Sequence, residues 1–137
     1  MERQSKKRRY QKTLHKGIIA PASIFYLGTL NAFSEIMKQD GFHVINTKGE
    51  DLDETPEFVE HIKADATTAF EIFEYLLNPL GVLKAIQTEK LFVSIPLSLW
   101  FAKAYCNRNN LWDQHFHEFE DWQFDWSLEK AEAQRKR

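Results

Sequence analysis

The fold expected for this chain depends most on residues 66–77, which read ATTAFEIFEYLL. Placed on a helix, this stretch and the residue after it carry only a narrow polar stripe, formed by Thr67, Glu71, Glu74 and Asn78. A helix with so narrow a polar stripe lies at the centre of a core. Asp65 suits the start of such a helix, and Pro79 disfavours helical geometry in the residue before it. The pattern therefore predicts a central core helix over residues 66–77.

The segments around this stretch add further helices. Residues 22–39 carry apolar side chains at helical spacing, and Gly41 follows as a stop signal. Shorter helices are expected over 56–64, 80–88 and 96–105. Residues 111–128 favour one more, because their aromatic residues fit helical spacing, although Trp122, Phe124, Trp126 and Leu128 also alternate as they would in a strand.

Two short segments have the composition of strands instead. Residues 42–47 are rich in β-branched residues and end in a Lys-Gly turn, and residues 91–95 are uncharged and apolar. The fold predicted from these patterns is mainly α, a compact bundle of about five or six helices. An α+β arrangement with two short strands, at 42–47 and 91–95, stays open as the alternative.

The charge of the chain is sorted by position. Residues 1–16 hold seven Lys/Arg and one acid, and residues 130–137 hold four Lys/Arg and one acid, which gives net charges of +6 and +3. The remaining residues, 17–129, hold seven Lys/Arg and eighteen Asp/Glu, a net charge of −11. We therefore expect a basic arm (1–16), a single globular, mainly helical domain (17–129) and a basic tail (130–137).

Composition narrows the class of protein. Eleven Phe, four Tyr and four Trp argue for a folded core, and only five Gly and four Pro suit a helix-rich chain. The lone cysteine, Cys106, excludes an intramolecular disulfide and a cysteine-based zinc cage, and is typical of a reducing, intracellular compartment. No phosphate-binding loop, dinucleotide fingerprint or nucleophile elbow occurs, so the sequence suggests no cofactor and no catalytic residue. We expect a cytoplasmic protein, or a nuclear one if the cell is eukaryotic.

The basic arm is a candidate site for nucleic acid or another polyanion. Clustered positive side chains neutralise phosphates and give salt-sensitive, sequence-independent binding. The acidic body would be repelled by a nucleic acid, so any such contact would be made by the arm. The candidate residues are Arg3, Lys6, Lys7, Arg8, Arg9, Lys12 and Lys16.

The run from Phe116 to Trp126 is a candidate docking surface for a protein partner. It combines three Phe and two Trp with four acidic residues, and aromatic anchors ringed by charge are typical of protein interfaces. The spacing assigns Phe116, Phe119 and Trp122 to the core-facing side of a helix and leaves Phe124 and Leu128 off that stripe. The candidate partner-binding residues are Phe119, Trp122, Phe124, Asp125, Trp126 and Leu128.

Three weaker alternatives stay open. Asp113, His115 and His117 would share one face of a strand and could then ligate a metal ion, as in a metal-dependent hydrolase, but on a helix they would diverge. Glu57, His61 and Asp65 form a stripe at helical spacing that could serve acid–base chemistry. Residues 17–34 carry no charge and could anchor the chain in a membrane. The favoured prediction is a small non-enzymatic interaction or regulatory protein, whose body docks on a protein partner while its basic arm contacts a polyanion; self-association stays open.

Overall fold

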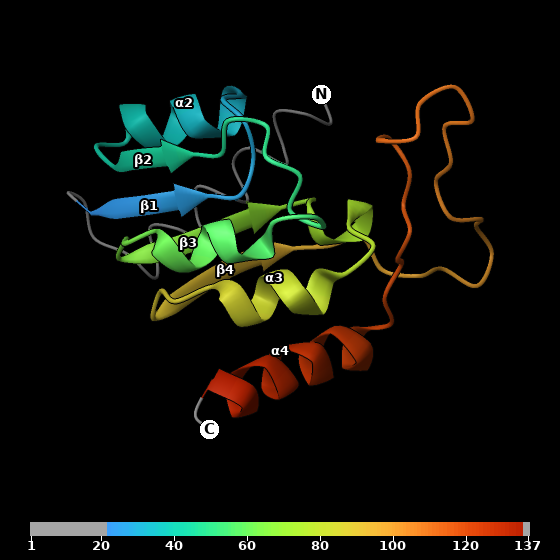
Figure 1. Cartoon of the computed structure of the whole chain (residues 1–137). Helices are drawn as coiled ribbons and strands as arrows, with labels where there is room; N and C mark the ends of the chain where they lie inside the picture. Colours follow the sequence, from blue (N-terminus) through green and yellow to red (C-terminus); the bar gives the residue numbers. More distant parts are fainter. Residues whose placement is uncertain (1–21, 136–137) are drawn as a thin grey trace. The chain divides into compact units, whose positions relative to one another are not determined.

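Four parallel strands form the sheet of this protein. The structure, a computed structural model, describes residues 22–135 (Figure 1). The strands are β1 (Ser23–Tyr26), β2 (His43–Asn46), β3 (Ala66–Phe70) and β4 (Lys90–Ser94), and their order across the sheet is β2-β1-β3-β4. All four run in the same direction. The fold is therefore α/β, and the prediction of a mainly α bundle of five or six helices is wrong.

The helical elements are short apart from the last one. They are α2 (Ala32–Gln39), the 3-10 helices η1 (Pro56–His61) and η2 (Phe73–Tyr75), α3 (Pro79–Ala85) and α4 (Asp121–Arg135). Strands lie at both positions expected from the sequence, as β2 and β4. Two more strands, β1 and β3, lie where helices were predicted, and these two occupy the middle of the sheet.

The helix predicted over residues 66–77 is wrong because a buried parallel strand resembles a buried helix in sequence. All five residues of β3 are buried. A central parallel strand is covered on both faces, so its apolar residues form a continuous run without the alternation of a half-exposed strand. The strand ends where Glu71 adopts a left-handed backbone conformation with φ of 56°. The 3-10 helix η2 follows this turn.

The helix predicted over residues 22–39 is reduced to its second half. Residues 23–26 form β1, which pairs with β2 on one side and β3 on the other. The helix α2 begins only after Asn31, whose side-chain oxygen accepts the backbone N–H groups of Phe33 and Ser34 at 2.9 and 3.2 Å. Such a cap fixes the helix start by satisfying N–H groups that have no partner within the helix.

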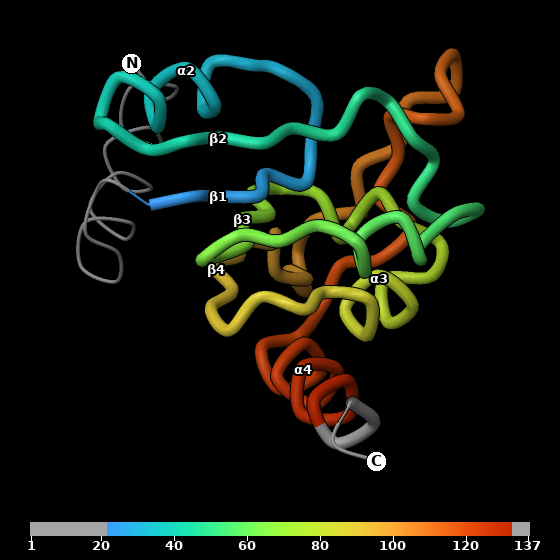
Figure 2. Tube along the Cα trace, turned by 60° about the vertical axis from the view of Figure 1, so that its left-hand side comes forward, coloured from blue at the N-terminus to red at the C-terminus, as the bar shows by residue number. Residues whose placement is uncertain are grey.

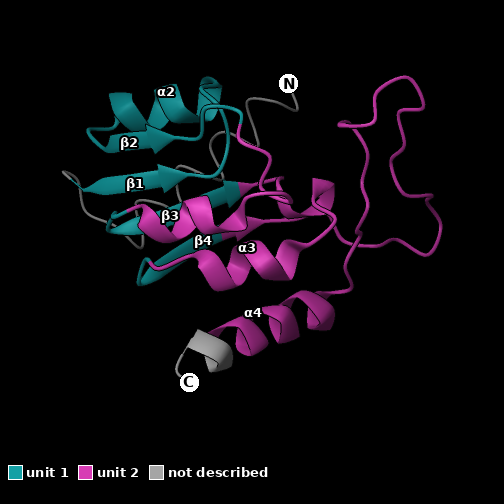
Figure 3. Cartoon of the chain, viewed as in Figure 1, with its two compact units in different colours: residues 1–49, 63–69, 88–92 teal, residues 50–62, 70–87, 93–137 magenta. Residues whose placement is uncertain are grey.

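The chain divides into two compact units (Figure 3). Unit 1 contains residues up to 49 together with 63–69 and 88–92; in it α2 packs beside β2 (Figure 2). Unit 2 contains residues 50–62, 70–87 and 93–137, and in it α3 contacts both η1 and α4. Each unit has its own buried apolar residues. Those of unit 1 include Ile24, Phe25, Leu27 and Met37, and those of unit 2 include Val59, Phe73, Val82, Leu83 and Phe124.

The sequence-based division into arm, domain and tail stays a prediction. Residues 1–16 lie outside the described part of the chain. Within it, α4 continues across the expected boundary at residues 129 and 130 without a break.

Residues 95–120 form a long irregular segment within unit 2. Two isolated bridges, Leu97 with Phe119 and Cys106 with Gln114, are its only strand-like pairings. The helices expected over 96–105 and from residue 111 to 120 are therefore wrong, and the C-terminal helix spans Asp121–Arg135 instead. Asparagine side chains explain part of the difference. Those of Asn107 and Asn110 accept the backbone N–H groups of Asn109 and Trp112, which stabilises turns in place of a helix.

The described residues of the segment once considered as a membrane anchor, 17–34, belong to β1, the following turn and the start of α2. No helix within residues 22–135 combines the length and the apolar character that a membrane crossing requires.

Candidate interaction surface

The exposed large apolar side chains of the described residues are concentrated in one stretch of the sequence of unit 2. Of the twelve large hydrophobic residues that are exposed in the described chain, ten lie between residues 97 and 126. Trp100 is 95% exposed, Trp112 78% and Trp126 65%. We call this set the aromatic surface; its members are Leu97, Leu99, Trp100, Phe101, Tyr105, Leu111, Trp112, Phe116, Trp122 and Trp126. Single exposed apolar residues are ordinary, but ten within thirty residues of sequence make this stretch the candidate contact site.

Four members of the aromatic surface form two pairs, and within each pair the two rings are in contact. The rings of Trp100 and Phe101 meet edge to face with centroids 5.4 Å apart, and those of Trp122 and Trp126 do so at 5.2 Å. Trp122 and Trp126 are one turn apart on α4, which places them on the same side of the helix. These side chains are thus held as rigid pairs that could enter a partner's pocket together.

Polar side chains of the same segment are joined by hydrogen bonds. Tyr105 donates its hydroxyl to the Asp113 carboxylate at 2.9 Å, and Asn107 donates its amide to the same oxygen at 2.9 Å. His115 Nδ1 lies 3.1 Å from Glu118 Oε1, and both side chains are mostly buried. The segment therefore combines a network of hydrogen bonds between its polar side chains with aromatic side chains that are largely exposed.

This polar network also shifts the acidity of its members. Hydrogen bonds from Asn107 and then from Tyr105 lower the pKa of Asp113, since they stabilise its charged form. The bond to Asp113 raises the pKa of the Tyr105 hydroxyl, because the phenol is needed as a donor. Both shifts favour a charged Asp113 that organises the turn around it.

Backbone hydrogen bonds fasten the segment to the rest of unit 2. The Glu74 carbonyl of η2 accepts the N–H groups of Phe116 and His117 at 2.8 and 3.2 Å. Near the other end, Ser98 N–H donates to the Phe119 carbonyl at 2.8 Å. Phe119 itself is buried, with its ring centroid 5.1 Å from that of Phe124. These backbone bonds near residues 98 and 116–119 therefore hold the segment to unit 2, while its aromatic side chains other than Phe119 stay exposed.

The residues predicted to contact a partner, which lie on α4 and just before it, separate into two groups. Trp122, Asp125 and Trp126 are exposed. Phe119 and Phe124 are buried and Leu128 is half-buried. The sides of α4 on which these residues lie differ from the sequence-based prediction. That prediction assumed one continuous helix from residue 111, whereas residues 111–120 are irregular and the helix begins at Asp121. Of the predicted partner-binding residues, only Trp122, Asp125 and Trp126 are therefore accessible to a partner.

Sequence reasoning missed the most exposed members of the aromatic surface. Trp100 and Phe101 had been assigned to one side of a core helix, and Leu111 and Trp112 had been given no contact role. Apolar residues are assigned to a core by default, so their exposure has no direct signal in the sequence. The cluster of asparagines at 107, 109 and 110 was the available hint that a helix ends here.

The two weaker catalytic constellations are not assembled. His115 contacts Glu118, whereas His117 Nε2 lies 3.2 Å from the Leu77 carbonyl, so the two imidazoles have different partners. Within residues 22–135 no group of three or more His, Cys, Asp or Glu side chains could hold a metal ion. Glu57 and His61 lie on η1 in unit 2, while the Asp65 carboxylate accepts the backbone N–H and hydroxyl of Ser23 in unit 1.

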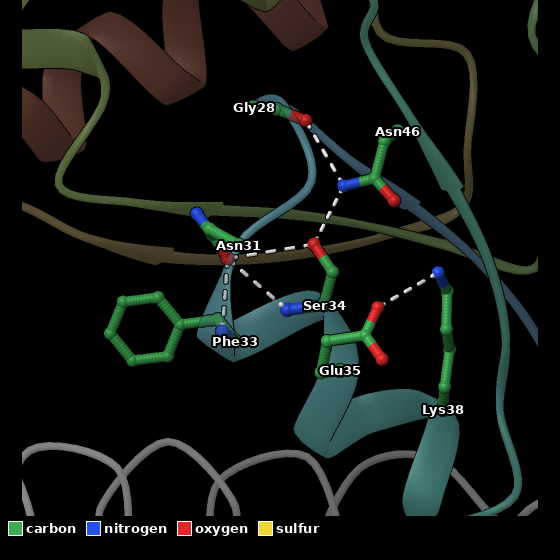
Figure 4. A network of polar contacts seen from close by, with 7 residues as sticks. All are labelled: Gly28, Asn31, Phe33, Ser34, Glu35, Lys38 and Asn46. Carbon is green, nitrogen blue, oxygen red and sulfur yellow. Dashed lines mark hydrogen bonds and ion pairs between the residues drawn. The ribbon is translucent and has the colours of Figure 1, made fainter.

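Parallel α/β sheets bind ligands at the carboxyl ends of their strands, which is where the loop after β1 lies. Figure 4 shows that this loop is closed by its own side chains. Asn31 caps α2, and Asn46 donates to the Gly28 carbonyl at 3.1 Å and to the Ser34 hydroxyl at 2.6 Å. A Cβ at Gly28 would lie 2.6 Å from the ring of Tyr26, so the turn is packed tightly as well. These contacts leave the loop with a structural role.

The seven basic residues proposed to bind a polyanion, Arg3, Lys6, Lys7, Arg8, Arg9, Lys12 and Lys16, lie outside the described residues. Comparisons of the chain with models of protein families, with curated proteins and with solved structures gave no match.

Proposed function

We propose that this chain is a non-enzymatic interaction protein whose aromatic surface docks on a protein partner that presents a basic, partly apolar face. The exposure of Trp100 and Trp112 is the observation that carries this proposal. Burying one large apolar side chain contributes about 1.5–3 kcal/mol. Several such side chains on one segment supply enough to drive association, since interfaces depend on a few aromatic anchors.

Charge indicates the chemistry of the partner. Residues 97–132 hold three Lys/Arg and seven Asp/Glu, a net charge of −4. This surface repels nucleic acid and the anionic face of a membrane, and it is complementary to a basic protein surface. The acidic residues would surround the aromatic anchors as a polar rim. A protein with clustered Lys and Arg beside an apolar patch is therefore the partner we propose.

The polar interior of the segment supports the same function. Tyr105, Asn107, Asp113, His115 and Glu118 fix the turns that carry the exposed rings. A surface ordered before binding loses less conformational entropy when it meets its partner. The network would thus raise affinity by ordering the exposed side chains before binding.

The test is a binding measurement with a matched control. The full chain is used to capture partners from its host, and the captured protein is purified and titrated against variants. We expect the double variant Trp100→Ala with Trp112→Ala to bind at least about tenfold more weakly, because each lost anchor costs more than about 1 kcal/mol. Leu30→Ala, which removes a similarly exposed side chain in unit 1, should bind like the parent.

Equal binding by the double variant would contradict the proposal, as would an equal loss in the Leu30→Ala control. Self-association of the pure chain that depends on Trp100 and Trp112 would replace the basic partner with a second copy. Sedimentation at several concentrations distinguishes these cases.

The basic arm suggests a separate contact with nucleic acid. Its net charge of +6 over residues 1–16 is the supporting observation. We expect the full chain to bind a single-stranded oligonucleotide with an affinity that falls steeply with salt. Deletion of residues 1–16 should remove this binding and leave the partner affinity unchanged. Equal oligonucleotide binding without the arm would overturn this part.

A further inference from the structure

A buried carboxyl group, that of Glu74, belongs to the residue whose backbone carbonyl is bonded to the irregular segment 95–120. The Glu74 side chain is fully buried in unit 2, and neither carboxylate oxygen has a hydrogen-bond partner. A buried ionised carboxylate without partners is strongly unfavourable, so such a group is held in its neutral form. Its position in η2 gives this protonation state a structural consequence.

Glu74 is also the residue that fastens the segment. Its backbone carbonyl accepts the N–H groups of Phe116 and His117. The neighbouring Tyr75 ring meets the ring of His115 edge to face, with centroids 5.0 Å apart. On the other side of Glu74, Phe73 packs against Phe124 of α4 with centroids 5.6 Å apart. A movement of the Glu74 side chain toward water would therefore disturb the turn that holds the segment.

We infer that the protonation state of Glu74 controls how firmly residues 95–120 are held, and we call this device the latch. While the Glu74 carboxyl is neutral, the turn η2 keeps its backbone hydrogen bonds to Phe116 and His117; when the carboxyl ionises, these bonds weaken and the segment is released. When the carboxyl ionises it must reach water, because no other described residue of unit 2 donates a hydrogen bond to it and its own backbone N–H offsets only part of the cost of burial. The turn η2 then opens and the two backbone hydrogen bonds weaken. The effect on partner docking rests on the proposed function, whereas the release itself does not.

The surroundings of Glu74 set the pH range of this latch. Burial raises its pKa to about 7, its own backbone N–H offsets part of that rise, and the charge of Glu71 adds to it. Tyr75, beside Glu74 in η2, is in turn near Tyr105, Asp113 and His115 of the segment, and His117 is bonded to the Glu74 carbonyl through its backbone N–H. From α4 the contact is the apolar ring of Phe124 against Phe73.

The sign of the pH dependence follows from the direction of the shift. The ordinary pKa of this group is 4.5, and the folded value is about 7, so the folded chain retains a proton that the unfolded chain has lost. The contribution of Glu74 to stability is therefore fully present below the ordinary value and is lost as the pH rises through the folded value. The segment should be held most firmly at acid pH, loosen progressively as the pH rises toward about 7, and change little at higher pH.

Hydrogen exchange of the full chain tests the latch without any partner. Protection of the peptide containing Phe116 and His117 is followed from about pH 6 to about pH 8, corrected for the intrinsic pH dependence of exchange. We expect protection to fall about tenfold in the parent, because the opening equilibrium shifts about tenfold per pH unit only between the ordinary and the folded pKa of Glu74 and levels off above the folded value of about 7. The fall should be absent in Glu74→Gln and retained in Glu60→Gln, which removes an exposed carboxylate of η1.

A fall of equal size in Glu74→Gln would overturn the latch and assign the transition to the histidines of the segment. Unchanged protection in the parent would overturn it as well. If Glu74→Gln does not fold, the carboxyl carbon of Glu74 is titrated by NMR in the parent. A midpoint near 7 supports the latch, and a midpoint near the ordinary value of 4.5 contradicts it. Loss of docking in the tryptophan variants with this transition intact would separate the two proposals.

Discussion

Two short apolar runs of this chain have similar compositions and opposite surroundings. Residues 23–27 of unit 1 read SIFYL, and residues 97–101 of unit 2 read LSLWF. Phe25 is 1% exposed, whereas Trp100 is 95% exposed. The first run pairs with a strand on each side, and the second forms a single isolated bridge, at Leu97. Composition therefore does not decide burial here; the pairing of the backbone does.

The difference in burial between the two runs suggests different roles for their aromatic residues: stability for residues 23–27 and, in our proposal, recognition for residues 97–101. A strand paired on both sides encloses its side chains, so unit 1 uses its aromatic residues to stabilise the fold. The irregular segment bonds many of its own backbone and polar groups and leaves most of its rings in water, which is why we propose that unit 2 uses aromatic residues for contact with a partner. Matched substitutions in the two runs test whether the first stabilises the fold and the second does not.

The largest expected effect is on folding stability in the first run. Phe25→Ala should lower the free energy of unfolding by about 3–5 kcal/mol, because it removes a fully buried ring and leaves a cavity. Trp100→Ala should change it by no more than about 0.5 kcal/mol, since the side chain is already in water. Urea unfolding of both variants gives the comparison. A loss at Trp100 as large as that at Phe25 would show that the second run is part of a core.

A smaller effect is expected where asparagine side chains hold the two regions. Asn31→Ala should cost about 1 kcal/mol, because it removes the cap that accepts two N–H groups at the start of α2. Asn110→Ala removes a single bond to Trp112 N–H in the exposed segment and should cost less than about 0.5 kcal/mol. Thermal unfolding checks both. The reverse order would mean that the irregular segment contributes more to stability than the cap of α2.

How far the sequence predicts the fold depends on how each element is buried. The strands at 42–47 and 91–95 were identifiable because they are short, β-branched or uncharged, and bounded by turns. The central strands β1 and β3 were not, because burial on both faces removes the alternation that distinguishes a strand. The start of η1 at Pro56 was predictable for a different reason, since proline favours the first position of a helix.

The candidate site was predictable only in part. The acidic and aromatic composition of residues 116–126 indicated an interface, and Trp122, Asp125 and Trp126 are exposed as an interface requires. Trp100 and Trp112 gave no such signal, because their spacing fits a buried helix face equally well. Their exposure follows from turns formed by Asn107 and Asn110 and from the internal network around Asp113. Such long-range polar contacts cannot be obtained from periodicity.

The central claim is that the aromatic surface is free in the isolated chain and covered by its partner. Oxidative footprinting of the full chain, read by mass spectrometry at each tryptophan, measures this directly. We expect Trp100 and Trp112 to be oxidised rapidly in the isolated chain and to be protected in the purified complex, while reactive positions of unit 1 stay unchanged. Slow oxidation of both tryptophans in the isolated chain, or equal oxidation with and without the partner, would contradict the account.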